Sequence, residues 1–154
     1  MAIRVGVISD THGLLRPEAV EALAGSEIIV HAGDVGNREI LTELEKIAPV
    51  RAIRGNVDYG ELAAALPHDE VVEVAGRYLY LIHDRNDLDL DPVAAGFDVV
   101  ITGHTHKPLI EERKGVTYLN PGSAGPRRFS LPTTVAKLVV SAEAIDAEIL
   151  ELKI

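Results

Sequence analysis

Cysteine is absent from the 154 residues, which excludes disulfide bonds and metal sites built on thiolates. A chain without cysteine suits a reducing compartment, and we expect this protein to be cytoplasmic. Tryptophan is absent as well, and four tyrosines and two phenylalanines are its only aromatic residues. Few rings are therefore available to stack on a nucleobase.

Long apolar runs are also missing. No stretch reaches the roughly 18 residues that are needed to cross a bilayer. The first six residues lack the basic and apolar segments of a signal peptide. We therefore expect no association with a membrane.

Basic residues are in short supply, with 15 Lys and Arg against 24 Asp and Glu and a formal net charge of −9. Non-specific binding of nucleic acid needs clustered basic side chains, so we do not expect it. Divalent cations reverse the sign of the charge where they bind. An acidic chain can therefore still hold a phosphate ester.

The length predicts a single domain over residues 1–154. The first third alternates apolar runs with helical patterns, which is typical of parallel strands joined by right-handed crossovers. Pro17 suits the first turn of one helix, and Asn37 is suited to cap the next. The predicted order is strand 3–8, helix 17–23, strand 27–30, helix 38–47 and strand 50–53.

The rest of the chain favours hairpins, because pairs of apolar runs flank short turns. The predicted pairs are 70–74 with 78–82, 109–113 with 116–119, and 133–140 with 144–152. A short helix over 92–96 and a strand over 98–102 lie between the first two pairs. Residues 122–132 fit no element, and a loop of this length in a small domain is often functional.

Polar clusters follow five of these apolar runs, where strands are expected to end. In chain order they are Asp10-Thr11-His12, Gly33-Asp34, Gly55-Asn56, His83 and Gly103-His104-Thr105-His106. Open α/β sheets place their sites in the loops that follow strand ends. Alternate residues of an extended segment point to the same side, so each Asp-Thr-His or His-Thr-His pair is expected to converge on one ion.

Two Asp, one Asn and four His offer seven donors, which suit two ions that share a carboxylate. A set without sulfur favours Mn, Fe, Co, Ni or Zn over Ca or Mg. Two ions roughly 3.5–4 Å apart clamp the attacking and departing oxygens of a displacement and acidify a bound water, which suits phosphate esters. The alternative of a mononuclear zinc hydrolase, acting on another kind of ester, leaves several donors without a role.

The five clusters, in this order, resemble those of the calcineurin-like metallophosphoesterases, and most closely the small single-domain bacterial and archaeal phosphodiesterases. Asn120-Pro121-Gly122-Ser123 is similar to the same branch. The resemblance implies an α/β (α+β) fold, a four-layer αββα sandwich with two mixed β-sheets face to face and helices outside. It also implies a metal-dependent phosphodiesterase in which a metal-bridged hydroxide attacks phosphorus in line.

Carried over by position, the implied ligands of the first metal are Asp10, His12 and His106. Those of the second metal are Asn56, His83 and His104, and Asp34 bridges the two. Asp34, Asn56 and His104 are the residues expected to act directly in catalysis. The implied cofactors are two divalent transition metal ions, with Mn expected first and Fe, Ni, Co or Zn as alternatives.

Val57 departs from the larger family, in which many members carry a His after Gly-Asn that protonates the leaving group or holds the phosphate. Valine cannot transfer a proton, and general acid catalysis is typically worth about 10²–10⁴-fold. We therefore expect weak activity on alkyl monoesters and better activity on activated aryl or diester substrates. Asp84 is a candidate to orient a metal ligand, or else an exposed residue without a role in the site. Asp58 is a candidate for the same orienting role, or else a residue of a turn.

Substrate contacts are expected from the loop after Asn120. The guanidinium groups of Arg127 and Arg128 match phosphate geometry, and Gly122 and Ser123 are placed to offer donors. A solvated loop or a subunit contact is the alternative for the two arginines, and a turn without contact to substrate is the alternative for Gly122 and Ser123. Elsewhere, His31 is expected to support the site and His68 to lie at the surface.

The expected partner is a small phosphodiester or nucleotide-like substrate, and a homo-oligomer is left open. Only Tyr59 and Phe129 among the aromatic residues lie near the polar clusters in sequence, so the pattern does not single out a nucleobase. The main alternative is a non-catalytic protein-binding scaffold on the same fold, like a subunit of the retromer coat. That alternative predicts eroded ligand positions, whereas all seven are filled here.

Overall fold

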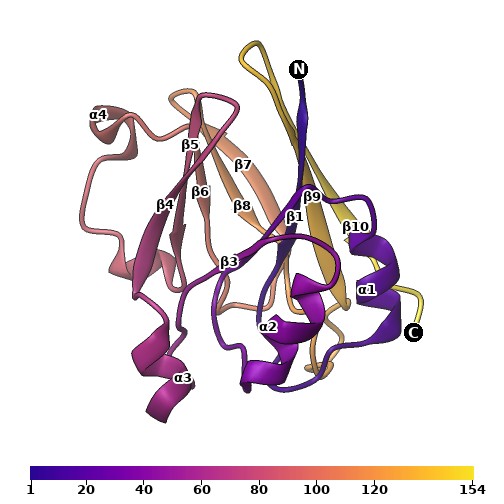
Figure 1. Ribbon diagram of the computed structural model, residues 1–154. Helices are drawn as coiled ribbons and strands as arrows, with labels where there is room; N and C mark the ends of the chain where they lie inside the picture. The colour runs from indigo at the N-terminus through magenta and orange to yellow at the C-terminus, as the bar shows by residue number, and fades with distance from the viewer.

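The apolar runs of the sequence form ten strands, and these build two mixed sheets that pack face to face (Figure 1). The computed structural model describes residues 1–154. Each predicted strand is present, with ends displaced by no more than one residue. The predicted α+β sandwich of two mixed sheets is therefore confirmed.

Sheet A has β1 at its centre, because the alternating valines of that strand are buried on the face that meets the other sheet. β1 pairs in parallel with β2 and antiparallel with β9. In spatial order the sheet consists of β10 (Ile145–Glu151), β9 (Thr134–Val140), β1 (Ile3–Ile8), β2 (Ile28–His31) and β3 (Val50–Ala52).

Sheet B combines two hairpin-type pairs with a parallel centre. β5, β6 and β8 run parallel, while the edge strands β4 and β7 pair antiparallel with their neighbours. In spatial order the sheet consists of β4 (Asp69–Val74), β5 (Arg77–Ile82), β6 (Val99–Ile101), β8 (Val116–Asn120) and β7 (Leu109–Arg113).

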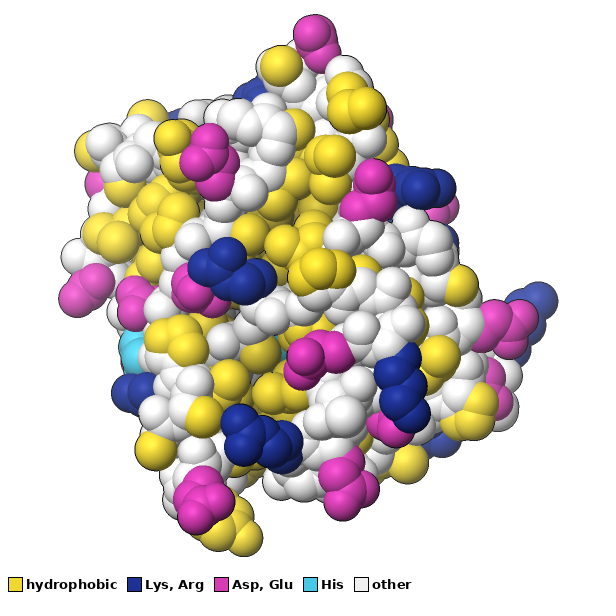
Figure 2. All heavy atoms as spheres, in the orientation of Figure 1, with side chains coloured by type: hydrophobic (Ala, Val, Ile, Leu, Met, Phe, Trp, Pro, Cys, Tyr) yellow, Lys and Arg dark blue, Asp and Glu magenta, His cyan; other side chains and the backbone are white.

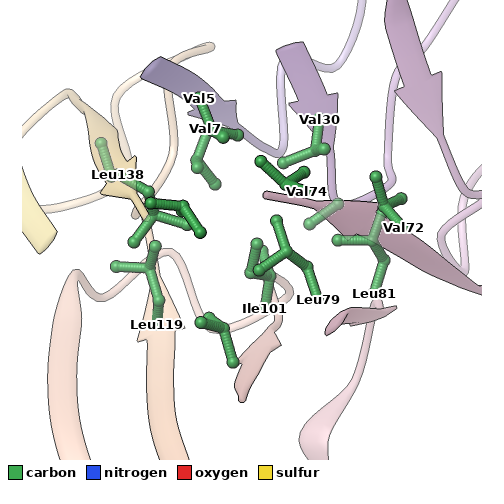
Figure 3. Close-up of a cluster of buried hydrophobic side chains, with 14 of the residues drawn as sticks. Val5, Val7, Val30, Val72, Val74, Leu79, Leu81, Ile101, Leu119 and Leu138 are labelled. Carbon is green, nitrogen blue, oxygen red and sulfur yellow. The ribbon is translucent and has the colours of Figure 1, made fainter. Parts of the chain in front are cut away.

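The main core lies between the two sheets and consists of β-branched and leucine side chains from both. Figure 3 shows Val5, Val7 and Val30 of sheet A opposite Leu79 and Ile101 of sheet B. Fifteen buried residues make up this cluster. Burial of an aliphatic side chain of this size stabilises the fold by roughly 1.5–3 kcal/mol each, so this layer fixes how the two sheets, and the loops at their ends, lie against one another.

Helices cover the outer faces. α1 (Pro17–Leu23) and α2 (Arg38–Glu45) pack Leu23, Ile40 and Leu44 against sheet A, and the Asn37 side chain caps α2 by accepting from the amide of Ile40 at 3.3 Å. On sheet B the cover is limited to the segment with η1 (Arg85–Asp87) and α4 (Pro92–Ala95). Neither η1 nor α3 (Gly60–Ala65) is predicted by the sequence pattern.

The parallel strands of both sheets end at the same end of the sandwich, the lower end in Figure 1, where α3 lies. The polar clusters follow these strands, so both sheets deliver candidate ligands to one place. Figure 2 shows the surface in the same orientation, with single basic side chains standing among acidic and apolar ones. No helix has both the length and the apolar character that a membrane span requires.

Candidate metal centre

The loops after β1, β2, β5 and β6 bring six candidate ligands together as two triads. Within each triad the potential ligand atoms all lie within 4.8 Å of one another. One triad is Asp10, His12 and His106; the other is Asp34, His83 and His104. Each triad takes residues from both sheets, so neither sheet alone forms a site.

Asp10 is fully buried, and its two carboxylate oxygens have different surroundings. Oδ2 accepts hydrogen bonds from the Ser9 hydroxyl at 2.6 Å and the His104 amide at 3.1 Å. Oδ1 has no hydrogen-bond partner and faces Nε2 of His106 at 3.4 Å and Nε2 of His12 at 3.7 Å. A buried, unpartnered carboxylate oxygen among imidazole nitrogens fits a bound cation, because burying such a charge alone is costly.

Asp34 lies between the two triads. Its Oδ1 accepts from the Val57 amide at 2.9 Å, while Oδ2 is 3.2 Å from Nε2 of His83 and 3.8 Å from Nε2 of His12. Burial alone would raise the pKa of this carboxyl, but the His83 ring next to Oδ2, the hydrogen bond from the Val57 amide and the nearby imidazole of His12 hold the pKa below its usual value. The carboxylate therefore stays ionised and faces both sets of ligands.

His83 and Asn56 complete the second cluster. The Nδ1 atom of His83 lies 2.7 Å from the carbonyl oxygen of Ala32 and donates to it, so Nε2 presents its lone pair. That Nε2 is 3.0 Å from Oδ1 of Asn56, which is also 3.1 Å from Nδ1 of His104. Three donor atoms of the kinds that transition metals prefer thus face one another.

Asp84 faces the outer side of the His104 ring, with Oδ2 3.7 Å from Nε2. At this distance the carboxylate makes no hydrogen bond, but its negative charge favours a proton on Nε2 and so leaves the lone pair on Nδ1, which is the nitrogen that faces Asn56. Oδ1 of Asp84 accepts from the Asn86 amide at 3.0 Å, which holds the carboxylate in place.

Asp84→Asn is expected to weaken the binding of the second ion about 10–100-fold, the usual cost of losing a partner that orients a ligand. The first ion should bind as before, because its triad contains no atom that Asp84 faces. Calorimetric titration of metal-free protein with Mn separates the two events. Asp89→Asn removes an exposed carboxylate nearby and serves as the control; equal affinities in both variants would contradict the orienting role.

The ligand loops share an unusual backbone conformation. Asp10, His12, Asp34, His104 and His106 all have positive φ, from 47° to 71°. The sequence predicts that each i, i+2 pair converges on one ion through extended alternation. Asp10 and His12 do share a triad, but through left-handed residues instead of extended ones, and for His104 and His106 the prediction is wrong because the two belong to different triads. Such conformations cost energy for residues other than glycine and cluster at functional sites.

Gly55 and Asp58 allow these loops to lie close together. A Cβ atom on Gly55 would lie 2.1 Å from Oδ1 of Asp34, so only glycine lets the β3 loop pass that carboxylate. Asp58 then ties the loops to each other, because its carboxylate accepts from the amides of Gly55 at 2.9 Å, Gly36 at 3.0 Å and Val35 at 3.2 Å. Of the two interpretations of Asp58, the contacts favour the one in which it supports the site.

His31 supports the same loops from beneath. Its Nδ1 accepts from the Gly33 amide at 3.1 Å, so its Nε2 carries the proton and donates to the Thr11 hydroxyl at 3.0 Å. That hydroxyl donates in turn to the Val35 carbonyl at 2.7 Å. Complete burial lowers the pKa of His31 to about 4, which keeps the ring neutral and the chain of donors in this order.

The loop after Asn120 is divided between buried and exposed residues. Gly122 and Ser123 are buried, with the Gly122 amide bonded to Asn120 Oδ1 at 2.9 Å and the Ser123 hydroxyl bonded to the Asp10 carbonyl at 3.0 Å. Gly122 and Ser123, which the sequence predicts to donate to substrate, therefore use these donors within the protein, on Asn120 and on the backbone of Asp10. Arg127 and Arg128 are exposed, and Arg127 lines a hollow of about 250 Å³ with residues of β10 and the chain end, none of them a candidate ligand.

Ser9, which donates to Asp10, is a supporting residue that the sequence does not single out. Asn120 is singled out only as part of the segment similar to the phosphodiesterase branch, and its side-chain amide also supports the site. Asn120 donates to the Gly103 carbonyl at 2.9 Å and the Thr105 hydroxyl at 3.1 Å, and so holds the loop of the last two histidines. Serine and asparagine are common in turns, so nothing in their spacing signals these contacts.

Comparisons with known proteins agree with this geometry. The model of the calcineurin-like phosphoesterase superfamily domain matches residues 3–143. The chain is 40% identical over 160 residues to a probable metallophosphoesterase of Methanothermobacter thermautotrophicus, with 95% of this chain and 91% of that protein covered.

Two solved structures show the same fold. One, described as a novel archaeal phosphodiesterase, has a TM-score of 0.79 at 26% identity and covers 96% of this chain and 100% of its own. The other is vacuolar protein sorting 29 from Cryptosporidium parvum, with a TM-score of 0.79 at 20% identity and 99% of each chain covered. At that identity the second likeness concerns the fold alone.

Proposed function

This chain belongs to the calcineurin-like phosphoesterase superfamily, and from that membership we propose that it is a phosphodiesterase that works with two divalent metal ions. The observation that carries the proposal is the position of Asp34, whose carboxylate faces imidazoles of both triads. A bridging carboxylate between two ion sites has this environment. The name of the archaeal structural relative, a phosphodiesterase, supports the same substrate class.

In this proposal Asp10, His12 and His106 would hold the first ion, and Asn56, His83 and His104 would hold the second. Asp34 would be shared by the two, and the set of nitrogen and oxygen donors favours Mn, with Fe, Ni, Co or Zn as alternatives. Two observations indicate that these residues suit metal ions. Oδ1 of Asp10 has no hydrogen-bond partner, and the lone pairs of Asn56 Oδ1 and His83 Nε2 face one another. When bound, the ions supply the positive charge that activates a water and stabilises the phosphoryl group during displacement.

The protein's own contribution is orientation. The ligand atoms are held in place before substrate arrives by the left-handed residues of the loops and by the hydrogen bonds of Asp58 and His31. This lowers the free-energy cost of reorganisation during the reaction. Val57 presents no proton donor and is exposed beside the site. Esters with activated aryl leaving groups need no proton at this position, whereas an alcohol leaving group needs a proton from water or from another residue.

The scaffold alternative has the fold of vacuolar protein sorting 29 in its favour. All seven ligand positions are nevertheless filled, and the buried Asp10 carboxylate has little reason to remain unpartnered in a protein that binds no ion. Metal analysis of the isolated protein combined with an assay of turnover separates the two. Two tightly held ions per chain together with phosphodiester hydrolysis favour the enzyme, and ions without hydrolysis favour the scaffold.

Hydrolysis of bis(p-nitrophenyl) phosphate tests the proposal directly. Purified protein with added Mn is expected to release p-nitrophenolate, and removal of metal with EDTA should stop the reaction. Addition of Mn after the chelator has been dialysed away should restore it. Protein that holds two ions and yet shows no turnover of this or any other phosphodiester would contradict the proposed activity.

A further inference from the structure

A polar pocket of about 250 Å³ lies beside the second triad. Two candidate ligands, Asn56 and His83, form part of its wall. The remaining wall has no apolar residue and consists of Arg54, Gly55, His68, Asp84 and Asp87. A group held in this pocket is therefore next to the reacting phosphate of the proposed function, and it meets only polar partners.

His68 belongs to the pocket because the segment before it is fixed to the β3 loop. The Arg54 amide donates to the Pro67 carbonyl at 2.9 Å, and the Arg54 guanidinium donates to the Leu66 carbonyl at 2.8 Å. These two bonds hold residues 66–67 against the loop that carries Asn56. His68 follows directly, so its ring lies along the pocket rather than on an unrelated surface.

The ring of His68 is half-exposed and is flanked by two carboxylates. Its Nε2 is 3.7 Å from Oδ2 of Asp87, and its Nδ1 is 4.0 Å from Oδ1 of Asp69. These distances lie within ion-pair range but are too long for hydrogen bonds. Neither nitrogen makes a hydrogen bond, and half of the side chain is open to solvent, so the ring can exchange protons with water.

We propose that this pocket receives the leaving group of a phosphodiester and that His68 donates the proton which the departing oxygen needs. The inference rests on the proposed phosphodiesterase function. It supplies the proton donor that Val57 does not provide, from a residue that follows α3 instead of the position after Asn56. The polar wall points to a hydroxylated alcohol as the natural leaving group, with Arg54 available to a hydroxyl or phosphate oxygen.

The proton and electron balance is simple. The oxygen of a water molecule forms a new bond to phosphorus, and a proton of that water passes to solvent. The bond from phosphorus to the ester oxygen breaks, and its electron pair stays on that oxygen. The imidazolium of His68 gives this oxygen a proton, so the product leaves as an alcohol, and the neutral ring takes a proton back from solvent.

A matched pair of substrates tests the role of His68. Ethyl phenyl phosphate and ethyl p-nitrophenyl phosphate transfer the same group but differ in how much the leaving oxygen needs a proton. In His68→Asn the rate with the phenyl ester is expected to fall about 10²-fold or more, within the range for general acid catalysis. The rate with the p-nitrophenyl ester should fall by a far smaller factor, because p-nitrophenolate departs without a proton.

The control is Asp89→Asn. Asp89 is exposed and follows the pocket residue Asp87 closely in sequence but does not line the pocket, so its replacement should alter neither rate by more than about twofold. Equal losses on both esters in His68→Asn, or no loss on either, would overturn the role of His68 while the phosphodiesterase function stands. Absence of turnover of both esters by the unaltered protein would instead count against the phosphodiesterase function itself.

A second readout does not depend on turnover. In zinc-loaded protein, the carbon-13 ring signal of His68, assigned by its loss in His68→Asn, is followed while glycerol 3-phosphate is added. This probe offers a phosphate to the ions and a polyol to the pocket. The His68 signal is expected to shift while that of buried His31 stays in place, and a His68 signal that does not move at saturation would overturn the proposal.

Discussion

Replacing Asp34 with asparagine is expected to abolish the Mn-dependent hydrolysis of bis(p-nitrophenyl) phosphate, with a loss of about 10²–10³-fold or more, the scale seen when one charge-stabilising group is removed from an active site. The amide has no negative charge to share between two cations. Oδ1 of Asp34 also accepts from the Val57 amide, so an asparagine can keep that bond while it loses the bridging role. The fold should therefore survive the change.

The measurement is the steady-state rate together with the number of ions bound per chain. Asp34→Asn should retain fewer than two tightly held ions and show an unchanged circular dichroism spectrum. Asp146→Asn removes an exposed carboxylate of β10 and is the control for the lost charge. A variant at Asp34 that turns over at the unaltered rate would rule out a bridging carboxylate in the mechanism.

His31 is expected to make the metal-free protein less stable as the pH falls from about 6.5 to about 4. In the folded state burial lowers the pKa of this imidazole from 6.5 to about 4. The unfolded chain takes up the proton first, near pH 6.5, so stability is full above that value and is lost progressively down to the folded pKa. A difference of this size corresponds to about 3 kcal/mol of unfolding free energy.

Urea unfolding at a series of pH values, with a chelator present, measures this loss. Asp34 and His83 also titrate with shifted pKa values, so the informative quantity is the difference between the unaltered protein and His31→Asn. Asparagine can accept from the Gly33 amide but does not titrate in this range. The two stability curves should converge by about 3 kcal/mol as the pH falls; parallel curves would contradict the buried neutral ring.

Much of the site could be predicted because its residues follow buried strands. The valines of β1 and the isoleucines of β2 identify strands, and Asp10 and Asp34 come just after them. Parallel strands end on one side of a sheet, so the polar residues after them meet. The apolar pattern does not predict that the parallel strands of both sheets end on the same side. That expectation comes from the family resemblance.

The conformation of the ligand loops could not be predicted. Extended alternation and a left-handed turn both bring residues i and i+2 together, and a sequence such as Asp10-Thr11-His12 is compatible with either. The turn is chosen by long-range contacts, such as the amides of His12 and Asp10 bonded to the carbonyls of Asp34 and Gly33 at 3.0 Å. Those partners lie more than twenty residues away in sequence.

The position of His68 was hidden for a similar reason. His68 follows Pro67, which predicts a surface residue, and its ring is indeed half-exposed. It reaches the pocket only because Arg54 binds the carbonyls of Leu66 and Pro67, and α3, which links the two segments, has no side-chain cap to reveal it. Hydrogen bonds to backbone carbonyls depend on geometry and leave little trace in residue type.

The division of each triad between the sheets has a mechanical consequence. Asp10 and His12 follow strands of sheet A and His106 follows a strand of sheet B, while Asp34 of sheet A faces His83 and His104 of sheet B. If ions bind as proposed, each would link the two sheets, and separating the sheets at this end would require ligands to leave their cation. The free energy of unfolding would then rise with the logarithm of the free metal concentration, and loss of metal would weaken the packing of the two sheets as well as the activity.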